Sequence, residues 1–495
     1  MTGQPLPDAE FDEALALVNE CRDGHGAVPR SAPPTTPTPT PAPAPQDAPY
    51  AQATPPAQST PPTPGEPKHR DVSPWPAARA RAAQAVPRAG GEPVAVPLDK
   101  ALGMTLAAPL AALTDLPSFD TSAMDGWAVA GPGPWVVRAD GILAGHDRPE
   151  ALGDGEAVRI ATGARIPRDA TAVLRSEHGR IDDKGRLHAL REVVPGQDIR
   201  PRGQECRSGD HLLPSGARIT PAVLGLAAAA GYDTLSAVRR PRAEVLVLGD
   251  ELLTDGLPRD GLIRDALGPM LPPWLRTLGA EVTGVRRLGD DPEALHEALT
   301  TSTADLVVTT GGTAAGPVDH VHPTLRRIGA ELLVDGVAVR PGHPMLLARL
   351  RPGRHLVGLP GNPLAAISGL LTLAEPLLRT LNGRGPGQPG GPATTAAYPA
   401  STPHHVSTEH PANTAYTAPV RDDVQGHPYD TRLVPVALRG EHAVPLRFNG
   451  PAMLRGIAAA DGLAVVPPGG AHKGQELEIL DLPWGPADDG GECFT

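Results

Sequence analysis

Residues 243–251 read AEVLVLGDE and decide the fold. An apolar run of this length that ends in Gly-Asp is typical of a strand buried on both faces and followed by a turn. The next segments predict a helix, a strand, a helix and a strand, at 263–279, 280–288, 292–302 and 305–312. Strands that alternate with helices predict parallel βαβ units and a doubly wound α/β sheet. Ligands of such sheets bind beyond the carboxyl ends of the strands.

The regions on either side of this segment differ in composition. The chain holds 56 Gly and 61 Pro, a share near that of low-complexity sequence. A helix is expected near 75–85, and short apolar runs between Gly, Pro and Asp predict β-rich structure over 96–240. The predicted order is an N-terminal helix (1–26), a Pro-rich disordered linker (27–74), helical and β-rich subdomains (75–240), the α/β domain (241–383), a low-complexity linker (384–430), a small barrel-like C-terminal β domain (431–484) and a tail (485–495).

Bulk properties exclude several classes of protein. The formal net charge of -12 argues against nucleic-acid binding, which needs concentrated Lys and Arg. Cys21, Cys206 and Cys493 lie far apart without a CxxC pair, so neither a disulfide framework nor a zinc site is expected. The acidic N-terminus lacks the basic start and apolar core of a signal peptide. Since no run of about 18 apolar residues is present, we predict no membrane span and a cytoplasmic protein.

Two turns with glycine and a carboxylate follow predicted strands of the α/β domain. In GDEL, 249–252, Asp250 could hold a metal ion or a polar ligand, or could form an acidic turn or helix cap. In TTGGTAAGPVDH, 309–320, glycine amides could cradle a phosphate, and Asp319 adds a second carboxylate. This second turn matches neither the GxGxxG dinucleotide fingerprint nor a Walker A loop.

Two further turns carry groups suited to an anion. In LPGNP, 359–363, Asn362 could cap the apolar helix that follows, or the helix N-terminus could bind an anion. In RPGHP, 340–344, Arg340 offers a bidentate fork for an oxyanion, and His343 a proton-dependent charge. A solvated basic turn is the alternative interpretation. Upstream, LPSFDTSAMDGWAV and ATGARIP predict shaped, glycine-containing loops at 116–129 and 161–167.

Taken together and in this order, the motifs resemble the molybdopterin molybdenumtransferase family, which includes bacterial MoeA and the gephyrin E domain. The resemblance covers about 75–383 and 432–482, with a likeness of 8–22 to the family's first helix. A single motif of this kind is weak, whereas several in register are specific. The segments that carry the resemblance are SAMDGWAV (122–129), RIATGARIP (159–167), GDEL (249–252), GGTAAGPVD (311–319), VRPGHP (339–344) and GLPGNP (358–363).

The resemblance implies four subdomains in an elongated homodimer, with the β-rich subdomain of one subunit facing the α/β domain of the other. It implies cleavage of adenylylated molybdopterin, release of AMP, and insertion of molybdenum from molybdate, with Mg²⁺ or another divalent ion. Further implied partners are a molybdopterin adenylyltransferase or an apo-molybdoenzyme. By motif position, the catalytic residues are Asp125, Asp250, Asp319 and Arg340; the cofactor-binding residues are Thr162, Gly311, Gly312, Gly316, His343, Pro360, Gly361 and Asn362; the metal ligands are Asp250, Asp319 and Glu205.

Several positions depart from the family pattern. The usual GGVSVGDYD becomes GGTAAGPVD, so Ala314 and Pro317 replace a serine and an aspartate. KPGKP becomes RPGHP, and the threonine before GDEL becomes Leu248. GEDI becomes GQEC at 203–206, where Glu205 keeps a carboxylate. Three hypotheses follow: an active, divergent transferase; a molybdopterin carrier or scaffold with weakened catalysis; or a molybdopterin adenylyltransferase, which would lack the SAMDGW segment and the C-terminal β domain.

Overall fold

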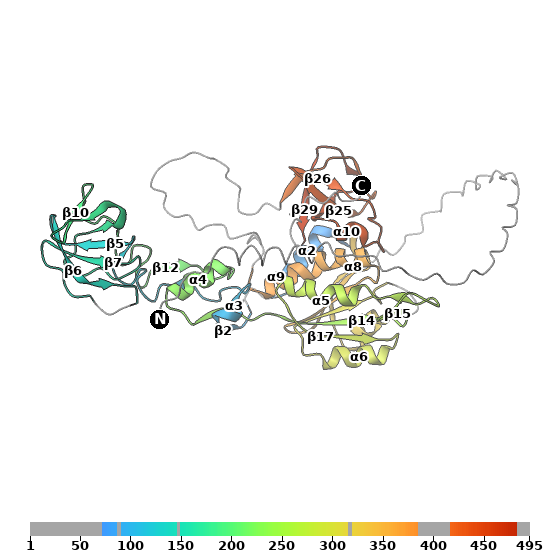
Figure 1. Cartoon of the computed structure of the whole chain (residues 1–495). Coiled ribbons are helices and arrows are strands. Elements are labelled where there is room, and N and C mark those ends of the chain that lie inside the picture. The colour runs from blue at the N-terminus through green and yellow to red at the C-terminus, as the bar shows by residue number, and fades with distance from the viewer. Residues whose placement is uncertain (1–71, 87–90, 146–148, 315–318, 385–415, 483–495) are drawn as a thin grey trace, which may run out of the picture. The chain divides into compact units, whose positions relative to one another are not determined.

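The computed structural model describes residues 72–86, 91–145, 149–314, 319–384 and 416–482 (Figure 1). The predicted helix at 1–26, nearly all of the Pro-rich segment 27–74, most of 384–430 and the tail 485–495 lie outside the described residues, and so do Gly316 and Pro317.

The α/β domain is built on a six-stranded sheet, as the sequence predicts. Its first four strands run parallel, and the last two are antiparallel to their neighbours. After β14 the chain forms β17 on one side of it and then β18 on its other side. This reversal makes a topological switch point between β14 and β18. The strands lie in the order β17 (Glu281–Leu288), β14 (Arg242–Leu248), β18 (Leu306–Thr310), β22 (Arg354–Leu359), β21 (Leu346–Arg351) and β19 (Glu331–Asp335).

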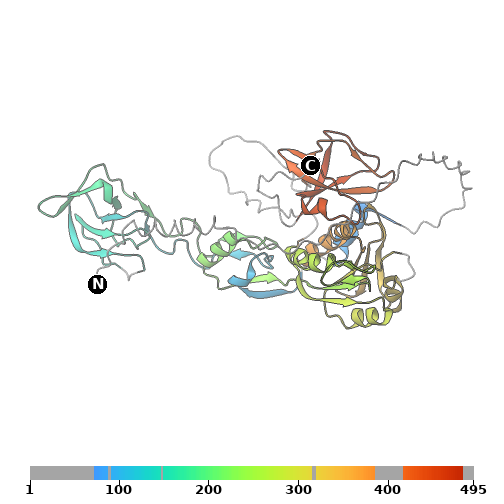
Figure 2. The same ribbon diagram turned by 45° about the vertical axis from the view of Figure 1, so that its right-hand side comes forward.

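Helices cover both faces of this sheet, because successive strand residues point to opposite sides and both sides are apolar. Alternate β14 residues divide between two cores, with Val245 and Val247 in one and Leu246 in the other. Figures 1 and 2 show α5 and α6 on opposite sides of the sheet. The first core contains α2 (Trp75–Gln84), α5 (Leu267–Thr277), α8 (Pro363–Gly369), the π-helical turn η2 (Leu370–Ala374) and α9 (Glu375–Leu381); the second contains α6 (Pro292–Thr301) and α7 (Val321–Arg327).

The helix predicted over 263–279 is shorter than expected. Ile263–Arg264 forms β16, which pairs with β15 (Leu252–Leu253). Asp265 then accepts hydrogen bonds from Leu267 N–H and Gly268 N–H, both at 2.9 Å, so the helix begins two residues after this carboxylate. α6 shows the same device, since Asp291 accepts from Glu293 N–H at 2.8 Å.

The stretch Pro363–Leu381 forms one long apolar helical segment. An 18-residue window within its 19 residues has a mean hydropathy of 1.3, enough for a membrane span by length and composition alone. However, 83% of this window is buried inside the protein, as in the core helix of a globular domain.

The C-terminal β domain adds a second large sheet that shares its core with the α/β domain: Leu433, Ile457 and Leu463 lie in the same apolar cluster as α8. The boundary predicted at 431 lies inside this domain, because β23 (Thr417–Pro419) and β24 (Val424–Gln425) already pair with strands of the domain. The stretch around them, rich in Gly, Pro, Thr and His, had suggested a linker. The strands of the sheet lie in the order β1 (Ser73–Pro74), β20 (Val337–Arg340), β25 (Thr431–Arg439), β27 (Gly462–Val466), β29 (Glu476–Asp481) and β23 (Thr417–Pro419). β26 (His442–Pro445) also pairs with β25, β28 (Gly470–Ala471) pairs with β24, and α10 spans Arg455–Ala458.

The segment 91–240 is β-rich, as its composition predicts. A six-stranded sheet orders β8 (Ala172–Arg175), β5 (Gly126–Val129), β7 (Glu156–Ile160), β6 (Trp135–Ile142), β10 (Arg186–Ala189) and β9 (Gly179–Ile181), with the turn η1 (Ser176–His178). Three smaller strand pairs are β2 (Pro93–Pro97) with β13 (Thr234–Val238), β3 (Leu110–Ala111) with β12 (His211–Leu213) and β4 (Thr121–Ser122) with β11 (Ile199–Arg200), beside α3 (Leu98–Ala101) and α4 (Pro221–Ala229).

Candidate active site

Four turns meet at the carboxyl edge of the α/β sheet. β17, β14, β18 and β22 are parallel, and each is followed by a turn that contains glycine. A hollow of about 230 Å³ lies among three of these turns and the start of α7. It is lined by Leu248, Gly249, Glu251, Gly289, Asp290, Asp291, Leu295, Gly311, Gly312, Asp319 and His320. The sequence-predicted Gly311, Gly312 and Asp319 are thus brought together here.

The carboxylate of Asp250 lies against the turn after β17. A Cβ placed on Gly289 would overlap Asp250 Oδ1, so only a glycine leaves room for this carboxylate. The contact places Asp250 beside the acidic residues Asp290 and Asp291. These two residues and Glu251 were not predicted from the sequence. The available signal was the GDDP segment, which follows a predicted strand as GDEL does.

The glycine turn after β18 has a left-handed backbone at two consecutive residues, with φ +79° at Gly311 and +65° at Gly312. A side chain is strained at both positions, which explains this residue choice. Gly311 N–H donates to Leu359 O at 2.8 Å and so ties the turn to the end of β22. A Cβ on Gly361 would lie 3.7 Å from Gly311 Cα. The two glycine turns therefore pack side by side.

The predicted metal ligands do not assemble as a set of three. Among the described ranges, no group of three or more His, Cys, Asp or Glu side chains is arranged to hold a metal ion. Glu205 belongs to the β-rich segment, where its N–H donates to Leu116 O at 2.9 Å. Asp250 and Asp319 instead follow strands of the α/β sheet, so motif position had grouped residues from separate elements.

The helix N-terminus after LPGNP is already occupied by another part of the chain. Leu364 N–H and Ala365 N–H donate to Pro451 O at 2.9 and 3.2 Å. Asn362 holds the N-cap position without a side-chain capping bond. The expected anion site on these amides and the expected side-chain cap are therefore both wrong, because a backbone carbonyl of the C-terminal β domain caps the helix. Pro360 and Gly361 form the preceding turn, and the Asn362 side chain is exposed.

The RPGHP turn packs beside the same helix. A Cβ on Gly342 would lie 3.1 Å from Ala365 O and 3.2 Å from Ser368 Cβ. Arg340 Nε donates to Asp430 Oδ2 at 2.8 Å, so the predicted oxyanion ligand already has one carboxylate partner. His343 is half-buried, and its Nδ1 is buried without a hydrogen-bond partner in the described part of the chain.

The structure brings Asp125 and Thr162 together in the β-rich segment. Asp125 precedes β5 and Thr162 follows β7, and these strands pair with Gly126 opposite Ile160. Asp125 Oδ1 accepts from Thr162 N–H at 2.7 Å and from Thr162 Oγ1 at 3.1 Å. The backbone bond first, and then the hydroxyl bond, lower the pKa of Asp125 below its ordinary value of 3.8. These two predicted residues therefore form one fixed anionic unit.

Three family models match successive regions of the chain. The MoeA N-terminal region (domain I and II) matches residues 74–231, the probable molybdopterin binding domain matches 244–380, and the MoeA C-terminal region (domain IV) matches 417–482. The chain belongs to the molybdopterin molybdenumtransferase family. The resemblance and the fold class predicted from sequence are confirmed.

Individual proteins to which the chain is similar carry names from the same family. The molybdopterin molybdenumtransferase of Staphylococcus aureus strain Mu50 is 32% identical over 304 residues, which cover 59% of this chain and 72% of that protein. Molybdopterin molybdenumtransferase 2 of Mycobacterium tuberculosis strain CDC 1551 is 35% identical over 312 residues, which cover 59% and 76%. The crystal structure of a molybdopterin biosynthesis MoeA protein from Pyrococcus horikosii has a TM-score of 0.63 at 25% identity, and the match covers 83% of this chain and 99% of that chain.

One departure from the family pattern can be located in the site. Leu248 Cδ1 would lie 3.4 Å from a Cβ on Gly312, so this leucine covers the glycine turn with an apolar surface where the family has a threonine. Thr313 is buried, and Ala314 is exposed at the end of the described segment. The glycine backbone of the family loop is therefore kept, while its side-chain polarity is reduced.

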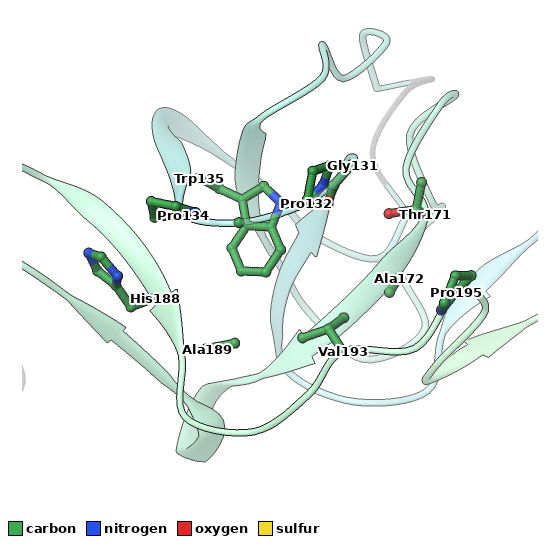
Figure 3. Close-up of a pocket in the computed structure, with 11 residues that line it drawn as sticks. Gly131, Pro132, Pro134, Trp135, Thr171, Ala172, His188, Ala189, Val193 and Pro195 are labelled. Carbon is green, nitrogen blue, oxygen red and sulfur yellow. Dashed lines mark hydrogen bonds between the residues drawn. The ribbon is translucent and has the colours of Figure 1, made fainter.

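A larger hollow, of about 660 Å³, lies in the β-rich sheet beyond β5. Figure 3 shows the Trp135 ring there, between Pro134 and Pro132. Its lining includes glycines, prolines and alanines, with Thr171 and His188 as polar side chains and no Asp, Glu, Lys or Arg. The smaller hollow at the sheet edge combines glycine turns with several charged side chains, and for this reason it is the candidate active site despite its size.

Proposed function

We propose that this protein inserts molybdenum from molybdate into molybdopterin, using adenylylated molybdopterin as substrate and releasing AMP. Membership of the family confirms the coarser prediction, a transferase of molybdenum-cofactor biosynthesis. The observation that carries the finer proposal is the carboxyl edge of the sheet, where consecutive left-handed glycines and several carboxylates surround one hollow at the switch point.

The proposed roles follow from the chemistry of each group. The Gly311–Gly312 turn lets a phosphate approach the backbone closely, and Arg340 can hold an oxyanion through its two terminal nitrogens. Asp250 and Asp319 would hold a divalent cation. Their oxygen donors suit Mg²⁺, which commonly takes one or two carboxylates and completes its shell with water and substrate phosphate oxygens. When bound, such an ion stabilises negative charge on phosphate oxygens.

We also propose that the active protein is a homodimer. Asp125 and Thr162 match family active-site positions, yet they belong to the β-rich segment and bond each other. In a dimer, this anionic pair of one subunit would face the α/β domain of the other. Sedimentation of the purified protein tests this point, and a monomer that remains fully active would contradict it.

A carrier or scaffold is the second candidate function. Leu248 against the glycine turn, and Ala314 in place of a serine, reduce the polarity of the phosphate-facing loop. These changes favour binding of molybdopterin without efficient turnover. An adenylyltransferase is disfavoured, because the chain also matches the N-terminal and C-terminal regions that flank the molybdopterin-binding domain.

The deciding experiment measures AMP release from adenylylated molybdopterin with molybdate and Mg²⁺, for the natural protein and for Asp250→Ala. The matched control is Asp140→Ala, which removes an exposed carboxylate paired with Arg138 in the β-rich sheet. Molybdate-dependent release that only Asp250→Ala loses supports the transferase. Tight binding of the substrate without release by the natural protein would leave the carrier.

A further inference from the structure

Arg340 is bonded in a way that leaves most of its guanidinium available. Nε donates to Asp430 Oδ2 at 2.8 Å, and no partner of the two terminal nitrogens is found among the described residues. The Arg340 side chain is 49% exposed, whereas that of Asp430 is 12% exposed. A carboxylate bound to Nε alone leaves the paired terminal nitrogens to form a bidentate contact with an oxyanion.

Asp430 is itself held firmly by the C-terminal β domain. It directly precedes β25, and its backbone N–H donates to His427 Nδ1 at 3.0 Å. β20 and β25 pair in parallel, with Val339 opposite Thr431 and Arg340 opposite Arg432. The strand ladder therefore keeps the base of Arg340 beside the Asp430 carboxylate, although 90 residues separate them in the sequence.

Arg432, which lies opposite Arg340 on this ladder, forms hydrogen bonds of a structural kind. Arg432 Nη1 donates to Gln425 O at 2.6 Å, and Arg432 Nη2 donates to Asn449 Oδ1 at 3.0 Å. Both terminal nitrogens of Arg432 thus bond within the C-terminal β domain. Arg340 has the opposite arrangement, since only its inner nitrogen has a partner among the described residues.

We propose that Asp430 is a positioning residue, which orients Arg340 so that its terminal nitrogens bind a phosphate oxyanion of the substrate. This inference rests on the proposed function, because it takes adenylylated molybdopterin as the ligand of Arg340. An ion pair with one half-exposed partner adds little to fold stability, so its main effect is expected on ligand binding. The C-terminal β domain would then contribute directly to the site on the α/β domain.

The test compares Asp430→Ala, Asp430→Asn, Arg340→Ala and the double variant Asp430→Ala with Arg340→Ala. For each, the dissociation constant for adenylylated molybdopterin, KM and kcat for AMP release, and the thermal unfolding midpoint are measured. Asp430→Ala should raise both the dissociation constant and KM about tenfold with kcat nearly unchanged, the coupling expected for contacting groups in one network. Asp430→Asn should recover part of the loss, because its Oδ1 still accepts from Nε. The double variant should bind no worse than Arg340→Ala.

The matched control is Asn449→Ala, which removes the side-chain partner of Arg432 and should leave KM unchanged. An equal loss from Asp430→Ala with and without Arg340, or a lower unfolding midpoint with unchanged affinity, would overturn the proposal. Failure of the proposed function is distinguishable. If the natural protein binds the substrate but releases no AMP, the dissociation constants of the variants still decide the role of Asp430.

Discussion

The two edges of the six-stranded α/β sheet use charge in different ways. At the amino edge, Asp305 accepts from both terminal nitrogens of Arg239, at 3.0 and 3.1 Å, and from Arg242 N–H at 2.7 Å. At the carboxyl edge, Glu251 and Asp290 gather with other carboxylates around a hollow. Charges matched by opposite partners stabilise the fold, whereas several charges of one sign around an open space attract an ion of the opposite sign, here a cation. The arrangement of the charges, more than their number, marks the binding edge.

The largest expected effect comes from removing charge at the carboxyl edge. Asp250→Asn keeps the shape of the side chain but removes its negative charge. We expect AMP release to fall by about 10²–10³-fold, or ~3–4 kcal/mol of transition-state stabilisation, as for other single electrostatic groups in active sites. The free energy of unfolding, measured with urea, should change little, because the substitution keeps the size and shape of the side chain. A twofold loss of activity or less would remove Asp250 from the catalytic set.

At the amino edge, a substitution is expected to lower the free energy of unfolding and to leave activity unchanged. Asp305→Ala leaves the Arg239 guanidinium and Arg242 N–H without their carboxylate partner. The free energy of unfolding should fall by about 1–2 kcal/mol, mostly because Arg242 N–H loses its acceptor, since the half-exposed Arg239 guanidinium can bond water instead. The specific activity of the folded fraction should be unchanged. If this variant lost activity as severely as Asp250→Asn without losing stability, the distinction between the two edges would be wrong.

Much of this architecture could be predicted from the sequence. The apolar run 243–248 fits only a buried strand, and glycines directly after three such runs indicate turns at one edge. Asp125 and Thr162 could be paired only through the family resemblance, since neither carries a local signal. Their contact depends on the pairing of β5 with β7 and joins residues that lie 37 positions apart in the sequence.

The features that could not be predicted depend on contacts between distant segments. Pro451 O caps α8 although nothing near LPGNP in the sequence indicates it. Asp430 lies in a stretch interpreted as a linker, yet it bonds Arg340. The grouping of Glu205 with Asp250 was inferred from motif position and not from geometry, and the described chain does not support it. A local sequence pattern indicates which groups a turn offers, whereas tertiary packing decides which of them remain available.

A smaller effect on activity is expected at the carboxyl edge where the backbone of Gly289 contacts the Asp250 carboxylate. Gly289→Ala introduces a methyl group that overlaps Asp250 Oδ1, so the carboxylate must move. We expect roughly a tenfold loss of AMP release, equivalent to ~1.4 kcal/mol, with little change in unfolding. Gly284→Ala is the matched control, because a Cβ there meets nothing within 4 Å in the strand that leads to the same turn. Equal activities of the two variants would show that the position of Asp250 is not critical.

The smallest expected effect concerns His355 at the amino edge, which is 1% exposed. Burial, with the nearby Arg349 charge, lowers the pKa of His355 below its ordinary value of 6.5, although bonding to Ala85 O and the charge of Asp305 oppose this. Its Nδ1 is buried without a partner in the described part of the chain, so a proton there would have no acceptor. The folded state therefore keeps the neutral ring at a pH where the unfolded chain is already protonated.

Because the folded-state pKa is the lower one, this contribution to stability is complete above pH 6.5 and is lost as the pH falls below that value. His355→Gln removes the titrating group while its amide can still donate to Ala85 O. We expect the free energy of unfolding of the natural protein to fall more steeply than that of the variant between about pH 7 and about pH 5, as urea titrations would measure. AMP release at neutral pH should not change, because the ring lies at the edge opposite the hollow. Parallel pH profiles for the two proteins would mean that His355, at the amino edge of the sheet, does not contribute to the loss of stability in acid and that other groups control it.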